Sequence, residues 1–124
     1  VKFREALAIG AVVTRGLDTS LFLLPLEEWG KLADKLGGLP LGQANSRAFA
    51  RLMLAGAMDT RLDKQGRFII PEYLRQYAGL KKDVVMVGLQ NRLEIWDKAA
   101  WVAYAKKAEE DSTAIAEQLG AMGI

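Results

Sequence analysis

The sequence contains neither cysteine nor histidine. The absence of cysteine excludes disulfides, thiolate metal sites and cysteine nucleophiles, and it leaves the redox compartment open. The absence of histidine removes the commonest general base and the commonest transition-metal ligand of proteins. Ser20, Ser46 and Ser112 have no activating partner at a suitable spacing, and the glycines form no phosphate-binding loop. We therefore expect a protein that is not an enzyme and that uses no metal, no cofactor and no small-molecule substrate.

Long apolar runs are missing as well. No stretch approaches the ~18–20 residues that a helix needs to cross a bilayer, and no basic segment followed by an apolar stretch opens the sequence. We therefore expect neither a membrane partner nor a signal peptide. The 124 residues are 51% apolar and 26% charged, a composition typical of a globular chain with one core or two small, closely paired halves.

The net charge of +2 is unevenly distributed along the chain. Residues 1–46 are balanced and residues 83–124 carry a net charge of −3, whereas residues 47–82 hold eight basic against three acidic side chains, a local charge of +5. A basic middle segment in a nearly neutral chain indicates a local anionic partner. The alternative is that these basic residues form the solvated face of an amphipathic helix.

An internal repeat with an offset of 72 residues runs through the chain. Val12, Val13, Gly16, Leu17, Leu21, Leu23 and Trp29 return as Val84, Val85, Gly88, Leu89, Leu93, Ile95 and Trp101. This recurrence predicts two copies of one supersecondary unit, each of which covers the apolar face of the other. Each copy reads as a hairpin followed by a helix, with strands at 11–14 and 21–24 and again at 84–87 and 93–96. The first helix is expected from Leu26 to Leu36, and the second begins after Asp97 as its N-cap.

The segment between the copies is predicted to contain a helix, two strands and a second, short helix. Asn45 or Ser46 caps the first helix, which runs to about Ala57. Its predicted apolar face consists of Phe49, Leu52, Met53 and Gly56. Strands at 59–62 and 67–70 surround a turn at 64–66, a helix at 71–77 follows, and the tail beyond Glu109 either extends the last helix or frays. The domain division is a first half at 1–46, a connecting helix at 47–58, a second half at 59–110 and a tail at 111–124.

The most informative stretch is the turn within residues 62–71. Gly66 can adopt a positive φ without steric cost, and Asp63 can accept hydrogen bonds from backbone amides across the turn and orient Arg67. Lys64 and Arg67 then project from a stiff loop, where a guanidinium fits a DNA groove or a phosphate. The alternative is an ordinary hairpin turn with a solvent-exposed ion pair.

Two further groups of residues have two possible roles each. Arg47 and Arg51 lie one helical turn apart, so they either contact DNA or pair with a neighbouring subunit. Trp29, Trp96 and Trp101 could stack on bases, but each lies at a strand end or on the apolar face of a helix. Core packing is therefore the preferred interpretation for the tryptophans.

Taken together, these motifs resemble the MraZ family of bacterial regulators. The likeness rests on the run from Asp63 to Pro71, followed by Leu74-Arg75, Ala78-Gly79-Leu80, Val87-Gly88, Glu94-Ile95-Trp96-Asp97 and Trp101. Earlier segments also match, namely Leu24-Pro25, Trp29, Phe49-Ala50-Arg51 and Ala55-Gly56-Ala57. The likeness covers nearly the whole chain up to Trp101, in the right order.

The resemblance implies an α+β fold, an AbrB-like swapped-hairpin β-barrel built from two repeated halves with peripheral helices. It further implies a cytoplasmic, nucleoid-associated, sequence-specific transcriptional regulator that binds double-stranded promoter DNA through the basic loops of a homo-oligomeric ring. In this family the promoter is that of the division and cell-wall gene cluster, which the protein itself regulates and which includes its own promoter. Asp63, Lys64, Gly66 and Arg67 match the second of two D-x-K-G-R elements. The first element is expected before the first residue of this sequence.

A second interpretation is a self-assembling ring or adaptor that binds protein partners. Its basic residues would meet acidic helices of neighbours, including the chain's own acidic C-terminal segment. The salt response distinguishes the two interpretations, because phosphate contacts release counterions and weaken steeply with salt. Either way we expect an oligomer, since apolar positions such as Phe22 and Leu24 need cover on both faces of small hairpins.

Overall fold

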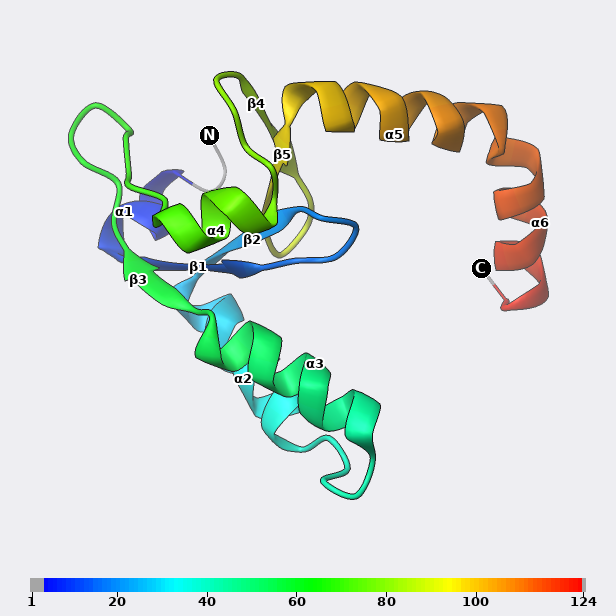
Figure 1. Ribbon diagram of the computed structural model, residues 1–124, viewed down its shortest axis with the longest axis horizontal. Coiled ribbons are helices and arrows are strands. Elements are labelled where there is room, and N and C mark those ends of the chain that lie inside the picture. The colour runs from blue at the N-terminus through cyan, green and yellow to red at the C-terminus, as the bar shows by residue number, and fades with distance from the viewer. Residues whose placement is uncertain (1–3, 124) are drawn as a thin grey trace.

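Two β-hairpins join side by side at the centre of one antiparallel sheet (Figure 1). The computed structural model describes residues 4–123, and its five strands lie in the order β3-β1-β2-β5-β4. In chain order the elements are α1 (Arg4–Ile9), β1 (Ala11–Arg15), β2 (Leu21–Pro25), α2 (Leu26–Gly37), α3 (Ala44–Ala55), β3 (Met58–Thr60), α4 (Glu72–Tyr77), β4 (Val84–Gly88), β5 (Leu93–Asp97), α5 (Lys98–Glu110) and α6 (Ser112–Ala121).

The two central strands pair in a register that reflects the 72-residue repeat. Leu21 lies opposite Ile95, Phe22 opposite Glu94, and Leu23 opposite Leu93. A shift of 72 positions exchanges the first pair with the third, so the ladder maps onto itself about the Phe22–Glu94 pair. This symmetry favours two equivalent halves, which stay a prediction. Barrel closure also stays a prediction, because no ladder joins β3 to β4 within residues 4–123.

The sheet carries a separate hydrophobic core on each face, because successive side chains of a strand point to opposite faces. The core beneath α1 and α4 includes Leu7, Val13, Leu21, Leu23, Leu74 and Ile95. The core beneath α2 and α3 consists of Phe22, Leu24, Leu36 and Met53. Our expectation that Phe22 and Leu24 need cover from outside the chain is therefore wrong, since α2 and α3 cover them.

Both predicted hairpins and the helix after each are confirmed, but the predicted strand pair at 59–62 and 67–70 is wrong. In this part of the chain β3 is limited to Met58–Thr60 and pairs with β1, while residues 61–71 form a loop. The Arg67 amide donates to a carboxylate instead of to a strand partner. Pro71 has no N–H to continue a ladder, so residues 67–70 stay outside the sheet.

Of the two predicted helix caps, the one at Asn45 or Ser46 is wrong, and the one at Asp97 is confirmed in position only. α3 begins one residue before Asn45, and its N-cap residue Gln43 makes no side-chain capping bond. Asp97 is the N-cap residue of α5, as predicted, but its carboxylate makes no capping hydrogen bond to the helix. It accepts a hydrogen bond from the Lys81 amide instead, with an oxygen–nitrogen distance of 3.2 Å. Short polar side chains can bond to several nearby backbone groups, and tertiary contacts decide between them.

α5 and α6 form an arm that extends away from the sheet (Figure 1). α5 contacts β4 and β5, and α6 contacts α5 after a break at Asp111. The tail is therefore a separate helix, neither a continuation of α5 nor a frayed end, and every residue of α6 is exposed. Among residues 4–123 no helix combines the length and apolar character that a membrane span requires.

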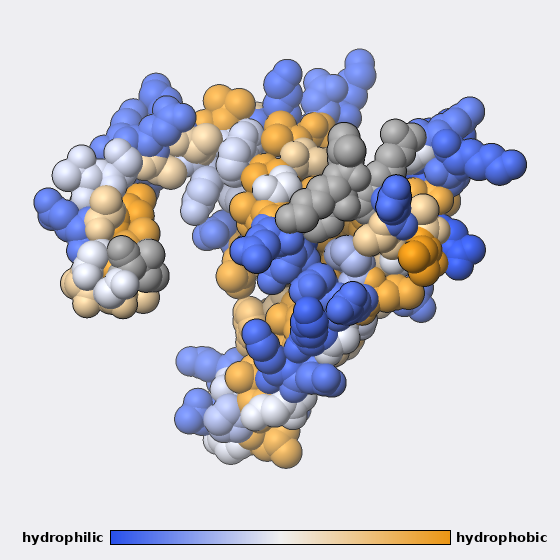
Figure 2. Space-filling view, turned by 180° about the vertical axis from the view of Figure 1, so that it is seen from behind, coloured by the Kyte–Doolittle hydropathy of each residue, from blue (hydrophilic) through white to orange (hydrophobic). Residues whose placement is uncertain are grey.

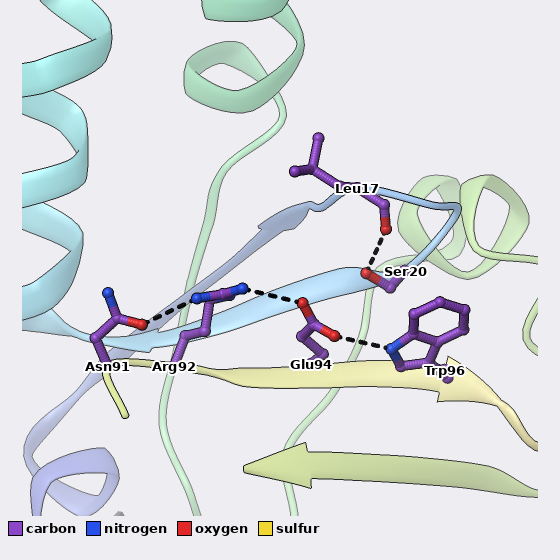
Figure 3. Close-up of polar contacts among 6 residues, drawn as sticks. All are labelled: Leu17, Ser20, Asn91, Arg92, Glu94 and Trp96. Carbon is purple, nitrogen blue, oxygen red and sulfur yellow. Dashed lines mark hydrogen bonds and ion pairs between the residues drawn. The ribbon is translucent and has the colours of Figure 1, made fainter. Parts of the chain in front are cut away.

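A chain of polar contacts connects the β4–β5 turn to the base of this arm (Figure 3). Arg92 donates to Asn91 and pairs with Glu94 at 3.3 Å, and Glu94 accepts a hydrogen bond from the Trp96 indole at 3.1 Å. Trp96 in turn packs against Trp101 of α5, with ring centroids 5.3 Å apart. The preferred interpretation of Trp96 as a core residue is confirmed, because it is 4% exposed.

Candidate nucleic-acid interface

The loop between β3 and α4 is organised around one carboxylate. Asp63 Oδ1 accepts hydrogen bonds from the amides of Gln65 and Arg67, at 2.9 and 2.8 Å, and Oδ2 accepts one from Arg67 Nε at 3.1 Å. Hydrogen bonds hold the pKa of Asp63 below its ordinary value of 3.8, first the bond from the Arg67 amide and then those from the Gln65 amide and the Arg67 side chain. Desolvation opposes them, because it raises the pKa. The carboxylate is therefore ionised at neutral pH and holds the loop closed.

The backbone of the same turn closes by two further bonds. The Asp63 amide donates to the Arg67 carbonyl at 2.8 Å, and the Gly66 amide donates to the Asp63 carbonyl at 3.0 Å. Gly66 has a φ of +78°, a left-handed conformation that glycine adopts without strain. The predicted roles of Asp63 as acceptor and Gly66 as turn residue are thus present in the geometry.

Apolar residues on both sides fix the loop to the body of the protein. Leu62, Phe68 and Ile70 pack against the core beneath α1 and α4. Pro71 then leads into α4, whose Leu74 is fully buried. The loop is consequently held at both ends while its tip is free of the core.

The tip carries three cations within seven residues. The Arg67 side chain is 73% exposed, and Lys64 and Arg61 are also exposed. Sequence reasoning did not single out Arg61, although its spacing from Lys64 and Arg67 was a visible signal. An open groove of about 710 Å³ runs beside the tip and is lined in part by Met58, Asp59 and Arg67. A guanidinium and an ammonium held outward on a stiff turn can contact phosphates and the edges of bases.

A cluster centred on Arg15 ties the helix after the loop to the rest of the fold. Arg15 lies 5.6 Å from the ring centroids of Tyr73 and Tyr77 of α4, and it donates to the Leu52 carbonyl of α3 at 3.1 Å. The Tyr73 hydroxyl donates to the Gly56 carbonyl at 2.8 Å. Sequence reasoning missed these positioning residues, because the contacting pairs are 17 to 62 positions apart and follow no period.

The two remaining predicted site residues lie elsewhere. Arg47 and Arg51 are on α3, which lies at the opposite end of the view from the loop (Figure 1). Arg47 is also engaged within the chain, since its guanidinium donates to the Leu41 carbonyl at 2.7 Å. The structure therefore groups Asp63, Lys64 and Arg67 but does not bring the α3 arginines to them.

Comparisons with known proteins point to one family. A family model described as "MraZ protein, putative antitoxin-like" matches residues 53–121. Relatives named "Transcriptional regulator MraZ" include proteins of Desulfitobacterium hafniense (47% identical), Acetivibrio thermocellus (46%) and Pediococcus pentosaceus (49%). Each of these alignments spans 123 residues, which is 99% of this chain and 86% of the relative.

Proposed function

Because the chain belongs to the MraZ family, whose relatives are named transcriptional regulators, we propose that it regulates transcription by binding duplex DNA through the loop at residues 61–67. The observation that carries this proposal is the internally bonded turn at Asp63, which presents Lys64 and Arg67 to solvent. Because the turn already orders a long cationic side chain, that side chain loses less conformational entropy on binding. This favours a defined contact over diffuse attraction.

We further propose that the target is the promoter of a division and cell-wall gene cluster that includes the regulator's own gene, and that the protein acts in the cytoplasm at the nucleoid. These statements extend the family resemblance to this chain. One loop offers few cations and binds weakly, so we also propose that several subunits of a homo-oligomeric ring contact adjacent repeats at once.

The competing function is an adaptor that binds only protein partners. The exposed apolar residues of the α5–α6 arm favour self-association, and they are compatible with both functions. The adaptor predicts no affinity for DNA, whereas the regulator predicts an affinity that falls steeply with salt.

The test compares Arg67→Ala with Asp63→Ala in binding to a duplex from upstream of the protein's own gene. Arg67→Ala removes an exposed ion pair, so the thermal unfolding midpoint should stay close to that of the unsubstituted protein. Its affinity for DNA should fall about 5- to 150-fold, the range for losing a base contact of ~1–3 kcal/mol. Asp63→Ala should lose affinity and also lower the midpoint, because it leaves the turn's amides without their acceptor.

A scrambled duplex of equal length serves as the control for sequence specificity. If Arg67→Ala unfolds the protein while the folded remainder binds DNA normally, the assignment of Arg67 to the interface is wrong. If the unsubstituted protein binds neither duplex at low salt, the adaptor replaces the regulator.

A further inference from the structure

A second cationic surface lies at the start of α5. Lys81, Lys82, Lys98 and Lys106 line an open groove of about 570 Å³, and all four are exposed. We call these four residues the lysine patch. Within residues 4–123 none of the four has a carboxylate oxygen within 4.0 Å of its ammonium group.

The acidic residues of this groove do not neutralise the patch. Asp83 and Asp97 also line it, which leaves the six charged groups with a net charge of +2. Asp97 is buried, with 8% of the residue exposed, and its carboxylate accepts a hydrogen bond from the Lys81 amide, whereas the four lysines are exposed to solvent.

Lys98 stands in a position that helix electrostatics disfavours. It is the first residue of α5, whose first turn contains no acidic side chain. The positive end of the helix dipole repels a cation there. The N-cap residue of α5 is the acidic Asp97, but its carboxylate accepts a hydrogen bond from the Lys81 amide, and among the described residues it forms no ion pair with Lys98. The Lys98 ammonium group is therefore open to an anionic ligand.

The repeat relates the lysine patch to the loop at residues 61–67. Thr60 of β3 pairs with Ala11, so that loop leaves the sheet next to Ile9 and Gly10, just before β1. A shift of 72 residues maps Ile9 and Gly10 onto Lys81 and Lys82, just before β4. The patch therefore occupies the same corner of the second hairpin that the loop occupies at the first.

The views of the molecule agree with this relation. In Figure 1 the connection from α4 to β4 and the start of α5 lie at the top, and the loop between β3 and α4 rises at the upper left. Seen from behind in Figure 2, hydrophilic groups follow the upper rim of the molecule.

From these observations we propose that the lysine patch is a second DNA contact, which binds phosphates of the duplex outside the segment that the loop contacts. This inference rests on the proposed function and adds a backbone-binding surface to it. Lysine ammonium groups are compact point charges without a fixed fork, so they contribute affinity and little sequence readout.

The test measures how DNA affinity depends on salt for Lys98→Gln/Lys106→Gln. The matched control is Lys35→Gln/Lys107→Gln, which removes two exposed lysines near helix C-termini outside the patch. Each phosphate contact contributes about 0.9 to the slope of log affinity against log salt. The patch variant should therefore show a slope shallower by about 1–2, and the control should match the unsubstituted protein. The preference for the promoter duplex over the scrambled duplex should be the same in all three proteins.

Three results would each overturn the assignment or the function, and they can be told apart. Equal slopes for the patch variant and the unsubstituted protein reject the patch while leaving the loop's role intact. A loss of promoter preference in the patch variant assigns base reading to it and rejects a backbone contact. No binding by the unsubstituted protein rejects the regulator itself. Circular dichroism of each variant establishes that it is folded.

Discussion

The exposed carboxylate of Asp63 holds its loop in one conformation, a role that hydrophobic packing normally has. Asp63 accepts three hydrogen bonds, two of them from backbone amides, and these bonds fix the positions of Lys64 and Arg67 without any hydrophobic contact at the tip. Hydrogen bonds to a charged acceptor are shorter and stronger than neutral ones. The loop can therefore be stiff and fully hydrated at once, which suits a surface that binds a hydrated polyanion.

The titration of Asp63 provides a prediction at this scale. Its pKa should lie below 3.8 in the folded protein, and it should stay below 3.8 in Arg67→Ala, because the Arg67 amide is the largest cause of the shift and survives the substitution. Carbon-detected NMR of the Asp63 carboxyl measures both values, with the urea-unfolded chain as reference. A return of the Asp63 pKa to about 3.8 in Arg67→Ala would show that the Arg67 guanidinium, and not the Arg67 amide, lowers it.

The sign of this shift fixes the pH range in which the loop is ordered. A folded-state pKa below the unfolded value contributes stability that is fully present above pH 3.8 and is lost as the pH falls through the lower, folded value. Asp63 therefore adds no pH dependence to DNA binding between about pH 5 and pH 8. Binding that titrates in that interval would have to depend on another group.

At the scale of elements, the C-terminal end of α3 connects the first hairpin to α4, the helix that follows the loop. Arg15 places a cation at the C-terminus of α3, where the helix dipole and the last carbonyls favour it. Thr14 of β1 donates to the Met53 carbonyl at 2.6 Å, and the Tyr77 hydroxyl donates to the Gly16 carbonyl at 3.0 Å. Bonds from β1 and α4 thus converge on the end of α3, and the Tyr77 bond joins α4 directly to the end of the first strand, so that α4 is held in one orientation.

Two glycine-to-alanine substitutions test this connection. Gly56 ends α3, and a Cβ there would meet the Leu52 carbonyl oxygen at 2.6 Å and the Arg15 guanidinium even closer. Gly56→Ala should therefore lower the free energy of unfolding by about 1–3 kcal/mol through overpacking. Gly30 lies within α2 and a Cβ there meets nothing within 4 Å, so Gly30→Ala should raise it by about 0.5–1 kcal/mol.

Urea unfolding of the two variants measures both changes, with Gly30→Ala as the matched control for the loss of glycine flexibility. Equal and favourable effects at both positions would mean that the Arg15 cluster yields to the added methyl group. The contacts of Arg15 that orient α4 would then be looser than the distances indicate.

At the scale of the whole molecule, the α5–α6 arm has apolar side chains that the single chain leaves exposed. Ile115 and Leu119 lie one turn apart on α6 and are 41% and 39% exposed, and Met122 beyond them is 72% exposed. An isolated helix of ten residues is marginal in water, so we expect a partner surface to stabilise α6. A second copy of the chain is the partner that the proposed ring supplies.

We predict that the protein is larger than its 13.6 kDa monomer in light scattering, and that Ile115→Glu/Leu119→Glu reduces its assembly. The matched control, Ala114→Glu/Gln118→Glu, adds the same two charges to a neighbouring face of α6. Because all four positions are exposed, neither variant should unfold the chain. The first variant should also lose the preference for a three-repeat duplex over a one-repeat duplex, since avidity needs several linked loops.

A monodisperse monomer of the unsubstituted protein at micromolar concentration contradicts this prediction directly. Equal affinity of the unsubstituted protein for one and three repeats contradicts the multivalent mode of binding while leaving the assembly itself standing.

The sequence by itself determined the local features of this protein. The two hairpins and the helices after them follow from β-branched runs, turn glycines and helical spacing, signals that act over a few residues. The loop at Asp63, Gly66 and Arg67 was likewise predictable, because its hydrogen bonds join residues at most four positions apart. The family resemblance rested on the same short motifs.

Only the tertiary structure decided what depends on distant residues. Residues 67–70 have the composition of a strand, yet within the described residues no strand pairs with them, because β3 ends at Thr60 and pairs with β1. Asp97 is the N-cap of α5 as its position predicted, but its carboxylate bonds to the Lys81 amide, 16 positions away, and not to the helix. Phe22 and Leu24 found cover from α2 and α3, and Arg15 met Tyr73 and Tyr77 across 58 and 62 positions. Local patterns fix which elements form, whereas the competition among partners for each side chain is settled only when the whole chain has packed.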